Sequence, residues 1–244
     1  MNLELLQKFE TLSLVDIQNK APLLEREDKK FVLAIKKINC VLEECLEEYQ
    51  ILKIENDLFF EYKTAYYDTK NLELYQNHHS GKGNRNKIRE RLYVNSGLKF
   101  VEIKNKNNKG KTIKHRLQTD TILEAEKFVA THTGLSISDL VKTLNIEYSR
   151  ITLLHKKNLE KVTLDYNLIF SNNFVTVKYD NIVIAEVKTE KSTNIKFGNI
   201  MKKYGIREGS LSKYCLGLVS LDNQVKHNNF KYKYNKTLKI NNNE

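Results

Sequence analysis

The sequence has few of the residues that mark flexible linkers, with one proline, Pro22, and nine glycines among 244 residues. No proline-, glycine- or serine-rich stretch therefore divides the chain, and its length suits one large domain. A run of about 18 apolar residues is also missing, and Met1–Glu10 mixes charged residues with leucine, unlike a signal peptide. We expect a soluble cytoplasmic protein with one domain over residues 1–222 and a basic, flexible tail over residues 223–244.

Cysteine is scarce as well, and the three present are Cys40, Cys45 and Cys215. An odd number of cysteines without a Cys-x-x-Cys pair indicates neither a disulfide framework nor a cysteine-based zinc site. We therefore expect the three side chains to be reduced thiols in the core or close to the surface.

Positive charge is what the sequence has in excess, because 41 Lys and Arg residues face 30 Asp and Glu residues, a formal net charge of +11. The 40% of hydrophobic residues is enough for one sizeable core. The charge points to an anionic partner, which could be nucleic acid, a membrane headgroup, a nucleotide or polyphosphate.

Hydrophobic periodicity predicts both helices and strands, which indicates an α+β protein. The predicted helices cover Asn2–Phe9, Ala34–Tyr49, Leu72–Tyr75, Thr121–Thr131, Ser136–Leu144, Ile195–Tyr204 and Ser212–Leu221. The predicted strands cover Arg26–Leu33, Tyr62–Asp68, Lys87–Tyr93, Leu98–Lys106, Lys111–Leu117, Tyr148–His155, Lys161–Phe170, Phe174–Tyr179 and Ile182–Thr189.

Five predicted strands share one design, because alternate residues of a strand point to opposite faces. In Lys87–Tyr93, Lys87, Arg89 and Arg91 share one face, and Ile88 and Leu92 share the other. The same alternation sets ionic residues opposite aliphatic ones on four further strands: Glu102 and Lys104, Lys114 and Arg116, Lys161 and Asp165, and Glu186 and Lys188.

Two architectures fit this alternation. In an ordinary antiparallel sheet the ionic face would point to water. However, Lys and Arg dominate the ionic faces, and the predicted amphipathic helices need the aliphatic faces as a packing surface. A sheet rolled into a small antiparallel β-barrel would turn the ionic faces inward, where confined like charges require a polyanion and usually a divalent metal. This second architecture predicts a phosphate-rich ligand.

An ordered series of short motifs resembles the VTC domain, the polyphosphate polymerase domain of the triphosphate tunnel metalloenzymes, in its stand-alone prokaryotic form. The resemblance covers roughly residues 23–221 in the right order. Its motifs are Arg26-Glu27-Asp28-Lys29-Lys30-Phe31, Tyr67-Asp68-Thr69 with Leu74-Tyr75 and His78, Lys87-Ile88-Arg89-Glu90-Arg91-Leu92-Tyr93, Val101-Glu102-Ile103-Lys104, Lys111-Thr112-Ile113-Lys114, Val162-Thr163-Leu164-Asp165, Ala185-Glu186-Val187-Lys188 and Leu211-Ser212-Lys213-Tyr214-Cys215.

The resemblance implies an antiparallel barrel of about eight strands with helices packed outside and a charged tunnel inside. It implies transfer of the γ-phosphoryl group of ATP to inorganic polyphosphate or pyrophosphate, with Mn²⁺ or Mg²⁺ as cofactor. Carried over residue by residue, it implies that Arg89, Arg91, Lys104 and Glu186 are catalytic, Glu186 also binding the metal, and that Lys30, Lys114, Lys161, Ser212 and Lys213 bind the substrate.

Each implied role has an ordinary structural alternative. Arg89 and Arg91 could pair with Glu102 across strands, Glu186 could pair with Lys188 or Lys104, and the strand lysines could be solvated. We expect His78 to be a solvated loop residue. Two positions depart from the eukaryotic relatives. Lys161 replaces an arginine, which keeps the charge but loses the bidentate fork. Ser210 replaces a lysine, which makes the tunnel mouth less basic.

Two other functions remain open at this point. The same tunnel could hydrolyse triphosphates or nucleotides, because water can replace the acceptor phosphate. The substitutions at Lys161 and Ser210 are also consistent with a polyphosphate-binding module without turnover. We do not expect a specific nucleic-acid binder, because no helix-turn-helix, ribonucleoprotein motif or zinc ligand set is apparent. The basic tail leaves a peripheral membrane partner open.

Overall fold

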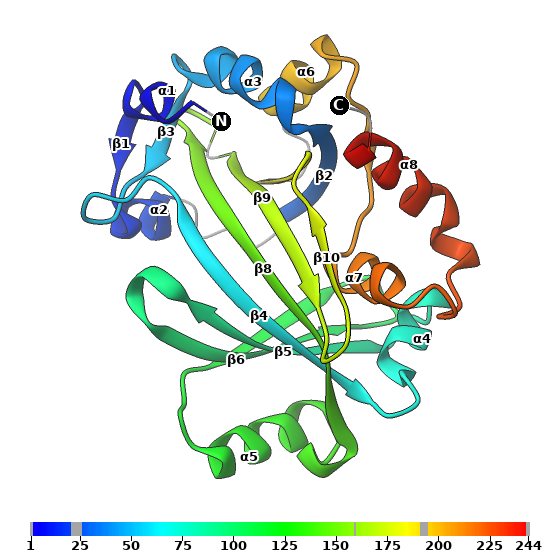
Figure 1. Cartoon of the computed structure of the whole chain (residues 1–244). Helices are drawn as coiled ribbons and strands as arrows, with labels where there is room; N and C mark the ends of the chain where they lie inside the picture. Colours follow the sequence, from blue (N-terminus) through cyan, green and yellow to red (C-terminus); the bar gives the residue numbers. More distant parts are fainter. Residues whose placement is uncertain (1, 21–25, 159, 191–194, 243–244) are drawn as a thin grey trace.

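The computed structural model describes residues 2–20, 26–158, 160–190 and 195–242, and within them twelve strands form one sheet (Figure 1). The strands are β1 (Glu10–Leu12), β2 (Arg26–Ala34), β3 (Tyr49–Leu52), β4 (Phe60–Thr69), β5 (Arg85–Tyr93), β6 (Leu98–Lys106), β7 (Thr112–Leu117), β8 (Leu140–His155), β9 (Lys161–Ser171), β10 (Thr176–Tyr179), β11 (Ile182–Glu190) and β12 (Glu208–Gly209). The α-helices are α1 (Leu3–Gln7), α2 (Leu14–Lys20), α3 (Ile38–Cys45), α4 (Glu73–His79), α5 (Ile122–Thr133), α6 (Lys196–Lys203), α7 (Lys213–Leu221) and α8 (Lys231–Asn242). Short 3₁₀ turns lie at η1 (Ile35–Lys37), η2 (Val94–Ser96), η3 (Ile137–Asp139) and η4 (Asn228–Phe230).

The main path of the sheet runs in the order β12-β2-β11-β9-β8-β4-β5-β6-β7, and neighbouring strands along it are antiparallel. Strand β10 pairs with β9, β3 pairs with β8, and β1 adds to β3 in parallel. The sheet is strongly bent, and Figure 1 shows β5 and β6 running across the direction of β8 and β9. This bend brings strands that are distant in the sheet order to face one another.

The aliphatic strand faces form the core, as strand alternation predicted. Val162, Leu164 and Val183 of β9 and β11 are fully buried in one cluster with residues of α3 and α6. A second cluster joins Ile88 and Ile103 of β5 and β6 to α4 and α5. Because helices cover these faces, the alternate ionic residues are left on the inner side of the bend.

Helix α7 packs on β8 and β9, and its backbone approaches these strands closely. A methyl group at Gly217 would lie only 2.7 Å from side-chain atoms of Leu144 on β8 and of Phe170 on β9. Glycine therefore allows the contact that sets the position of α7, and with it the position of Ser212 and Lys213 at the start of the helix.

The predicted α+β class, with an antiparallel sheet and helices packed on it, is confirmed, but the closed eight-stranded barrel is not. In the described part of the chain the sheet has twelve strands, and its end strands β12 and β7 do not pair with each other. Instead, Lys87 on β5 donates to the Ser212 hydroxyl, and Lys30 on β2 donates to the Leu211 carbonyl. Strand alternation predicts which face is ionic, but it carries no information on whether the edge strands meet.

Several predicted elements have different bounds in the structure. The helix predicted for Ser136–Leu144 is wrong, because β8 begins at Leu140 and pairs with β4. The helix predicted to end at Tyr49 ends at Cys45, and Tyr49 begins β3. The segment predicted as a flexible tail contains η4 and α8, although its flexibility stays a prediction. Among the described helices, none is long and apolar enough to cross a bilayer.

Candidate functional site

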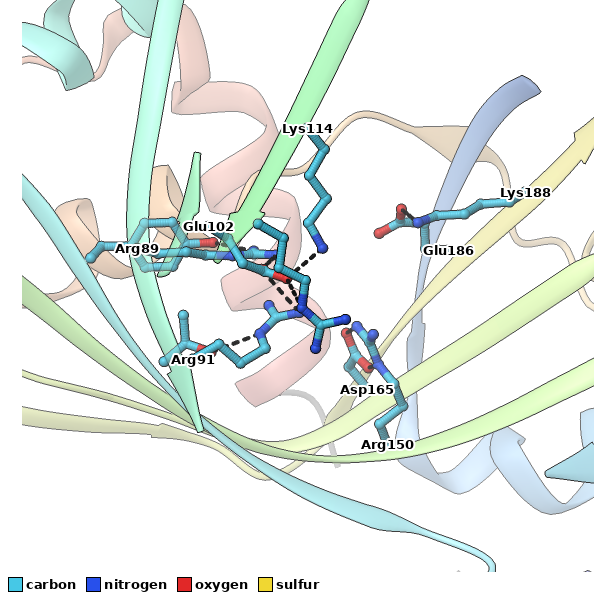
Figure 2. A network of polar contacts seen from close by, with 11 residues as sticks. Arg89, Arg91, Glu102, Lys114, Arg150, Asp165, Glu186 and Lys188 are labelled. Carbon is cyan, nitrogen blue, oxygen red and sulfur yellow. Dashed lines mark hydrogen bonds and ion pairs between the residues drawn. The ribbon is translucent and has the colours of Figure 1, made fainter. Parts of the chain in front are cut away.

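The inner ionic face is built from seven strands and the start of α7. Figure 2 shows part of it, with Arg89, Arg91, Glu102, Lys114, Arg150, Asp165, Glu186 and Lys188. We define it by ten cationic side chains, Lys30, Lys87, Arg89, Arg91, Lys104, Lys114, Arg116, Arg150, Lys188 and Lys213, and three carboxylates, Glu102, Asp165 and Glu186. These residues face one another across the bend of the sheet. In the sheet order, β6 and β11 are separated by four strands, β9, β8, β4 and β5. Nevertheless, Glu186 and Lys188 of β11 are close enough to Lys104 of β6 to affect its pKa. The set carries a formal excess of seven positive charges, which favours binding of a polyanion.

Glu102 on β6 is the centre of the first group of contacts. The Arg89 Nε and Nη2 atoms lie 2.7 Å and 2.5 Å from Glu102 Oε2, and Lys114 contacts Glu102 Oε1. Arg91 and Arg116 add longer ion pairs of 3.8 Å and 3.7 Å. The Glu102 side chain is fully buried, and its single negative charge is shared by four surrounding cations.

The protonation states of this group follow from burial and charge. Burial opposes ionisation of Glu102, but Arg89, Arg91 and Lys114 outweigh it and hold the pKa of this carboxyl well below its usual value. Burial lowers the pKa of Lys114 to about 8, although the contact with Glu102 acts in the opposite direction. The carboxylate is therefore charged and holds its partners in fixed positions.

Asp165 on β9 is the centre of the second group. Arg150 from β8 binds both carboxylate oxygens, at 2.5 Å and 2.7 Å, and Lys213 at the start of α7 contacts Oδ2. Burial opposes ionisation of Asp165, but Arg150 and Lys213 lower its pKa to about 2. The Arg150 guanidinium also lies over Tyr62 and Tyr148, 5.1 Å and 5.4 Å from their ring centroids. These contacts fix a forked cation on the inner face.

Glu186 is the carboxylate of the face, and Lys104 the lysine, with the fewest close polar partners among the described residues. Glu186 on β11 pairs with Lys188 at 3.2 Å and lies opposite Lys30 of β2 in the sheet register. Burial opposes its ionisation, but Lys188, Lys30, Lys104 and Lys213 hold its pKa well below the usual value. Lys104 makes no hydrogen bond or ion pair to a described residue, and burial, with Arg89 nearby, lowers its pKa to about 6. An anion placed here would supply the missing partner of Lys104.

A cavity of about 510 Å³ opens at one end of the inner ionic face, between β2, β5 and the helices α4, α7 and α8. Lys30 and Lys87 belong to both the face and the cavity lining. His78 also lines the cavity from α4, so the prediction that it is a solvated loop residue is wrong. Its Nδ1 atom is buried without a hydrogen-bond partner among the described residues. Burial and the nearby Lys87 and Arg85 lower its pKa to about 3, so the ring is neutral.

The structure brings together eight of the nine residues that the resemblance implied: Lys30, Arg89, Arg91, Lys104, Lys114, Glu186, Ser212 and Lys213. The ninth, Lys161, begins β9 opposite Lys188 in register and is half-buried. The pairing of Arg89 and Arg91 with Glu102, stated above as the structural alternative, is present, and so is the pairing of Glu186 with Lys188. The functional roles of these residues stay predictions.

Sequence reasoning missed Arg150, and it left Lys87, Arg116 and Lys188 on the ionic face without a role. The pattern that could have found Arg150 is the same alternation, since Tyr148, Arg150 and Thr152 alternate with Ser149, Ile151 and Leu153 on β8.

The residues present fit a divalent metal that shares its ligands with a substrate. The described residues contain no group of three or more His, Cys, Asp or Glu side chains that could enclose an ion. Of the three carboxylates that define the face, Glu102 and Asp165 each contact at least two cations, whereas Glu186 has one close ion-pair partner, Lys188. Mg²⁺ and Mn²⁺ are commonly held by one or two carboxylates with the remaining ligands from phosphates and water. Glu186 would hold such an ion only together with a bound phosphate chain.

Binding of a polyanion is expected to transfer a proton to Lys104. The lysine is mostly neutral at pH 7 because its pKa is about 6, and a bound phosphate chain would raise that pKa by attraction. Affinity for tripolyphosphate should therefore rise as the pH falls from about 8 to 6 and level off below 6. Isothermal titration in two buffers with different ionisation enthalpies at pH 7 measures the proton uptake. Lys104→Met should remove most of one proton, whereas Lys99→Met, which changes an outer lysine paired with Glu90, should not; equal uptake in both variants would contradict this assignment.

Comparison with known proteins gives a family and a fold. The family model described as the VTC domain matches residues 25–222. Among solved structures, a candidate adenylyl cyclase from Hippeastrum, HpAC1, described as having a dominant triphosphatase activity, is 15% identical with a TM-score of 0.54, over 81% of this chain and 96% of that one. A candidate adenylate cyclase from Bacillus halodurans is 13% identical with a TM-score of 0.50, over 78% of this chain and 96% of that one. These likenesses show a shared fold, and no curated protein matches the sequence.

Proposed function

Because the chain belongs to the VTC domain family, we propose that it is a metal-dependent polyphosphate polymerase that transfers the γ-phosphoryl group of ATP to a growing inorganic polyphosphate chain. The observation that supports this most strongly is the formal excess of seven positive charges on the inner ionic face. A polyphosphate chain has about one negative charge per phosphate, so a set of cations gathered on one inner face is the complement that it requires.

The proposed reaction conserves charge and atoms without a covalent enzyme intermediate. A terminal oxygen of the polyphosphate chain attacks the γ-phosphorus of ATP, the bond from this phosphorus to the β,γ-bridging oxygen breaks, and ADP leaves with that oxygen. The protein contributes by positioning the reactants and neutralising their oxygens. A divalent ion, when bound, would withdraw charge from the phosphoryl oxygens.

The residues of the inner ionic face would divide this work. Glu102 holds Arg89, Arg91 and Lys114 in place before a ligand arrives, and these residues keep further N–H donors for phosphate oxygens. Lys104, Lys188 and Lys30 surround Glu186 and would contact the chain as point charges. Lys213 and Ser212 would bind phosphate at the start of α7, and Lys161 would extend the row along β9.

Hydrolysis is the second candidate, and a specific observation favours it. The solved structure from Hippeastrum has a similar fold and is described as having a dominant triphosphatase activity. On the same face, water would replace the terminal phosphate as the nucleophile. The two activities differ in their products rather than in their binding residues.

The product pattern tests the proposal directly. Purified protein incubated with ATP and Mn²⁺, with pyrophosphate or a short polyphosphate as primer, is expected to produce ADP and a ladder of polymer on a gel. Orthophosphate as the main product would support hydrolysis instead. Tight polyphosphate binding without either product would indicate a binding module. If the protein forms no polymer, releases no orthophosphate and does not bind polyphosphate, then the polymerase, the hydrolase and the binding-module hypotheses are all wrong.

A further inference from the structure

The cavity at the end of the inner ionic face has two chemically different walls. One wall is mainly cationic: it contains Lys30, Arg85, Lys87 and Lys106 from the strands and Lys233 from α8, together with two acidic residues, Asp28 and Glu208. The other wall is apolar and aromatic, and it consists of Leu216, Val219, Phe230 and Tyr234 from α7, η4 and α8. An inorganic chain would use only the first wall, so the cavity suits an anion that also carries a flat, apolar group.

Half of the second wall, Phe230 and Tyr234, belongs to a segment outside the family match, which ends at residue 222. This segment is anchored at both ends. Near its start, the Tyr75 hydroxyl of α4 donates to the Lys226 carbonyl, and the Asn229 side chain donates to the His79 carbonyl. Near its end, Asn181, between β10 and β11, donates to the Asn241 carbonyl. The segment therefore runs from α4 to the β10–β11 connection, and it lines the cavity with Phe230, Lys233 and Tyr234. Figure 1 shows α8 beside α7 along this side of the molecule.

Lys233 places a positive charge beside Ser210, the residue whose replacement of a lysine led us to expect a less basic tunnel mouth. Its Nζ contacts the Ser210 hydroxyl, and both residues line the cavity. Ser210 lies two residues before Ser212, which accepts from Lys87. Lys233 thus restores a positive charge beside Ser210, from a different part of the chain.

Resting on the function proposed above, we infer that this cavity binds the nucleoside end of the nucleoside triphosphate, with Lys233 on a phosphate and Tyr234 along the base. The triphosphate would then extend past Lys30 and Lys87, which lie in both the cavity and the inner ionic face, toward Glu186. The neutral His78 ring beside Phe230, with ring centroids 5.8 Å apart, leaves its unpaired Nδ1 available to a sugar or base polar group. The C-terminal segment would therefore distinguish a nucleotide from an inorganic chain.

The test compares two ligands on three full-length variants. A non-hydrolysable ATP analogue, adenosine 5′-(β,γ-imido)triphosphate, and inorganic tripolyphosphate are titrated by calorimetry with Mg²⁺ present. Lys233→Gln should weaken both ligands about tenfold, because it removes a charge-assisted contact. Tyr234→Leu should weaken the ATP analogue roughly fivefold and leave tripolyphosphate unchanged, because only the analogue has a base to stack. Lys236→Gln, an exposed position on the same helix, is the control and should change neither affinity.

The outcomes separate this inference from the proposed function. If both ligands bind the wild type but Lys233→Gln behaves like Lys236→Gln, the inference is wrong and the proposed function stands. If Tyr234→Leu weakens both ligands equally, the cavity does not distinguish the base and the inference is also wrong. If wild type binds neither ligand, both proposals fail. Unchanged tripolyphosphate affinity in Tyr234→Leu would in addition show that this variant is folded.

Discussion

Replacing Glu102 by Gln is expected to lower the free energy of unfolding by about 3–5 kcal/mol at neutral pH. The Glu102 side chain is fully buried and contacts Arg89, Arg91, Lys114 and Arg116. A glutamine has a similar shape, but it is neutral and leaves these cations without a counter-charge. Chemical denaturation of the wild type and the variant measures the difference.

Glu90→Gln is the matched control for this prediction. Glu90 lies on β5, the strand that pairs with β6, and it is the sequence neighbour of Arg89. Its side chain points to the outer face and forms a half-exposed ion pair with Lys99 at 3.0 Å. Its replacement should change stability by about 0–1 kcal/mol. Tripolyphosphate should stabilise Glu102→Gln more than the wild type, because bound anion replaces the missing carboxylate. Equal stability of the two variants would contradict a central role for Glu102.

The acid sensitivity of the wild type follows from the same residue. The pKa of Glu102 is lowered in the folded protein, so its contribution to stability is complete above the unfolded-state pKa of about 4.5. The contribution is lost as the pH falls below that value toward the lowered folded-state pKa. The stability difference between wild type and Glu102→Gln should therefore shrink in acid, whereas that between wild type and Glu90→Gln should change little.

Much of the inner ionic face could be predicted from the sequence because the responsible pattern is local. The alternation of Arg89 and Arg91 with Ile88 and Leu92 follows from strand geometry, whatever the rest of the fold does. The buried Val162 and Leu164 opposite Asp165 follow in the same way. Once the strands were assigned correctly, alternation alone was enough to place these residues on the correct face.

Features that depend on contacts between distant segments could not be predicted in this way. The helix expected for Ser136–Leu144 contains Val141 and Lys142, whose pairing with β4 favours an extended backbone over the local helical pattern. A pair between Glu186 and Lys104 was stated above only as an alternative, because their proximity depends on the bend of the sheet, which alternation does not determine. The contact of Lys233 with Ser210 joins positions 23 residues apart, and the polar composition of the segment after residue 222 concealed it.

Replacing Glu186 by Gln is expected to reduce metal-dependent turnover roughly 10²–10³-fold, whichever product the enzyme forms. Glu186 is ionised, because Lys188, Lys30, Lys104 and Lys213 outweigh the effect of burial on its pKa. The substitution removes the carboxylate that would share a divalent ion with the phosphate chain, and it leaves the surrounding cations unchanged. Steady-state rates with ATP and Mn²⁺, compared with the wild type, give the loss.

Binding distinguishes a metal ligand at Glu186 from a merely structural carboxylate. In EDTA, Glu186→Gln should bind tripolyphosphate as tightly as the wild type or more tightly, because a negative charge has left a cationic surface. With tripolyphosphate present, electron paramagnetic resonance should show less protein-bound Mn²⁺ in the variant. Glu147→Gln is the control, since Glu147 forms an exposed pair with Lys63 at 3.4 Å, and it should preserve both turnover and Mn²⁺ binding. Weaker metal-free binding together with unchanged Mn²⁺ retention in Glu186→Gln would indicate that Glu186 orients Lys188 and holds no metal.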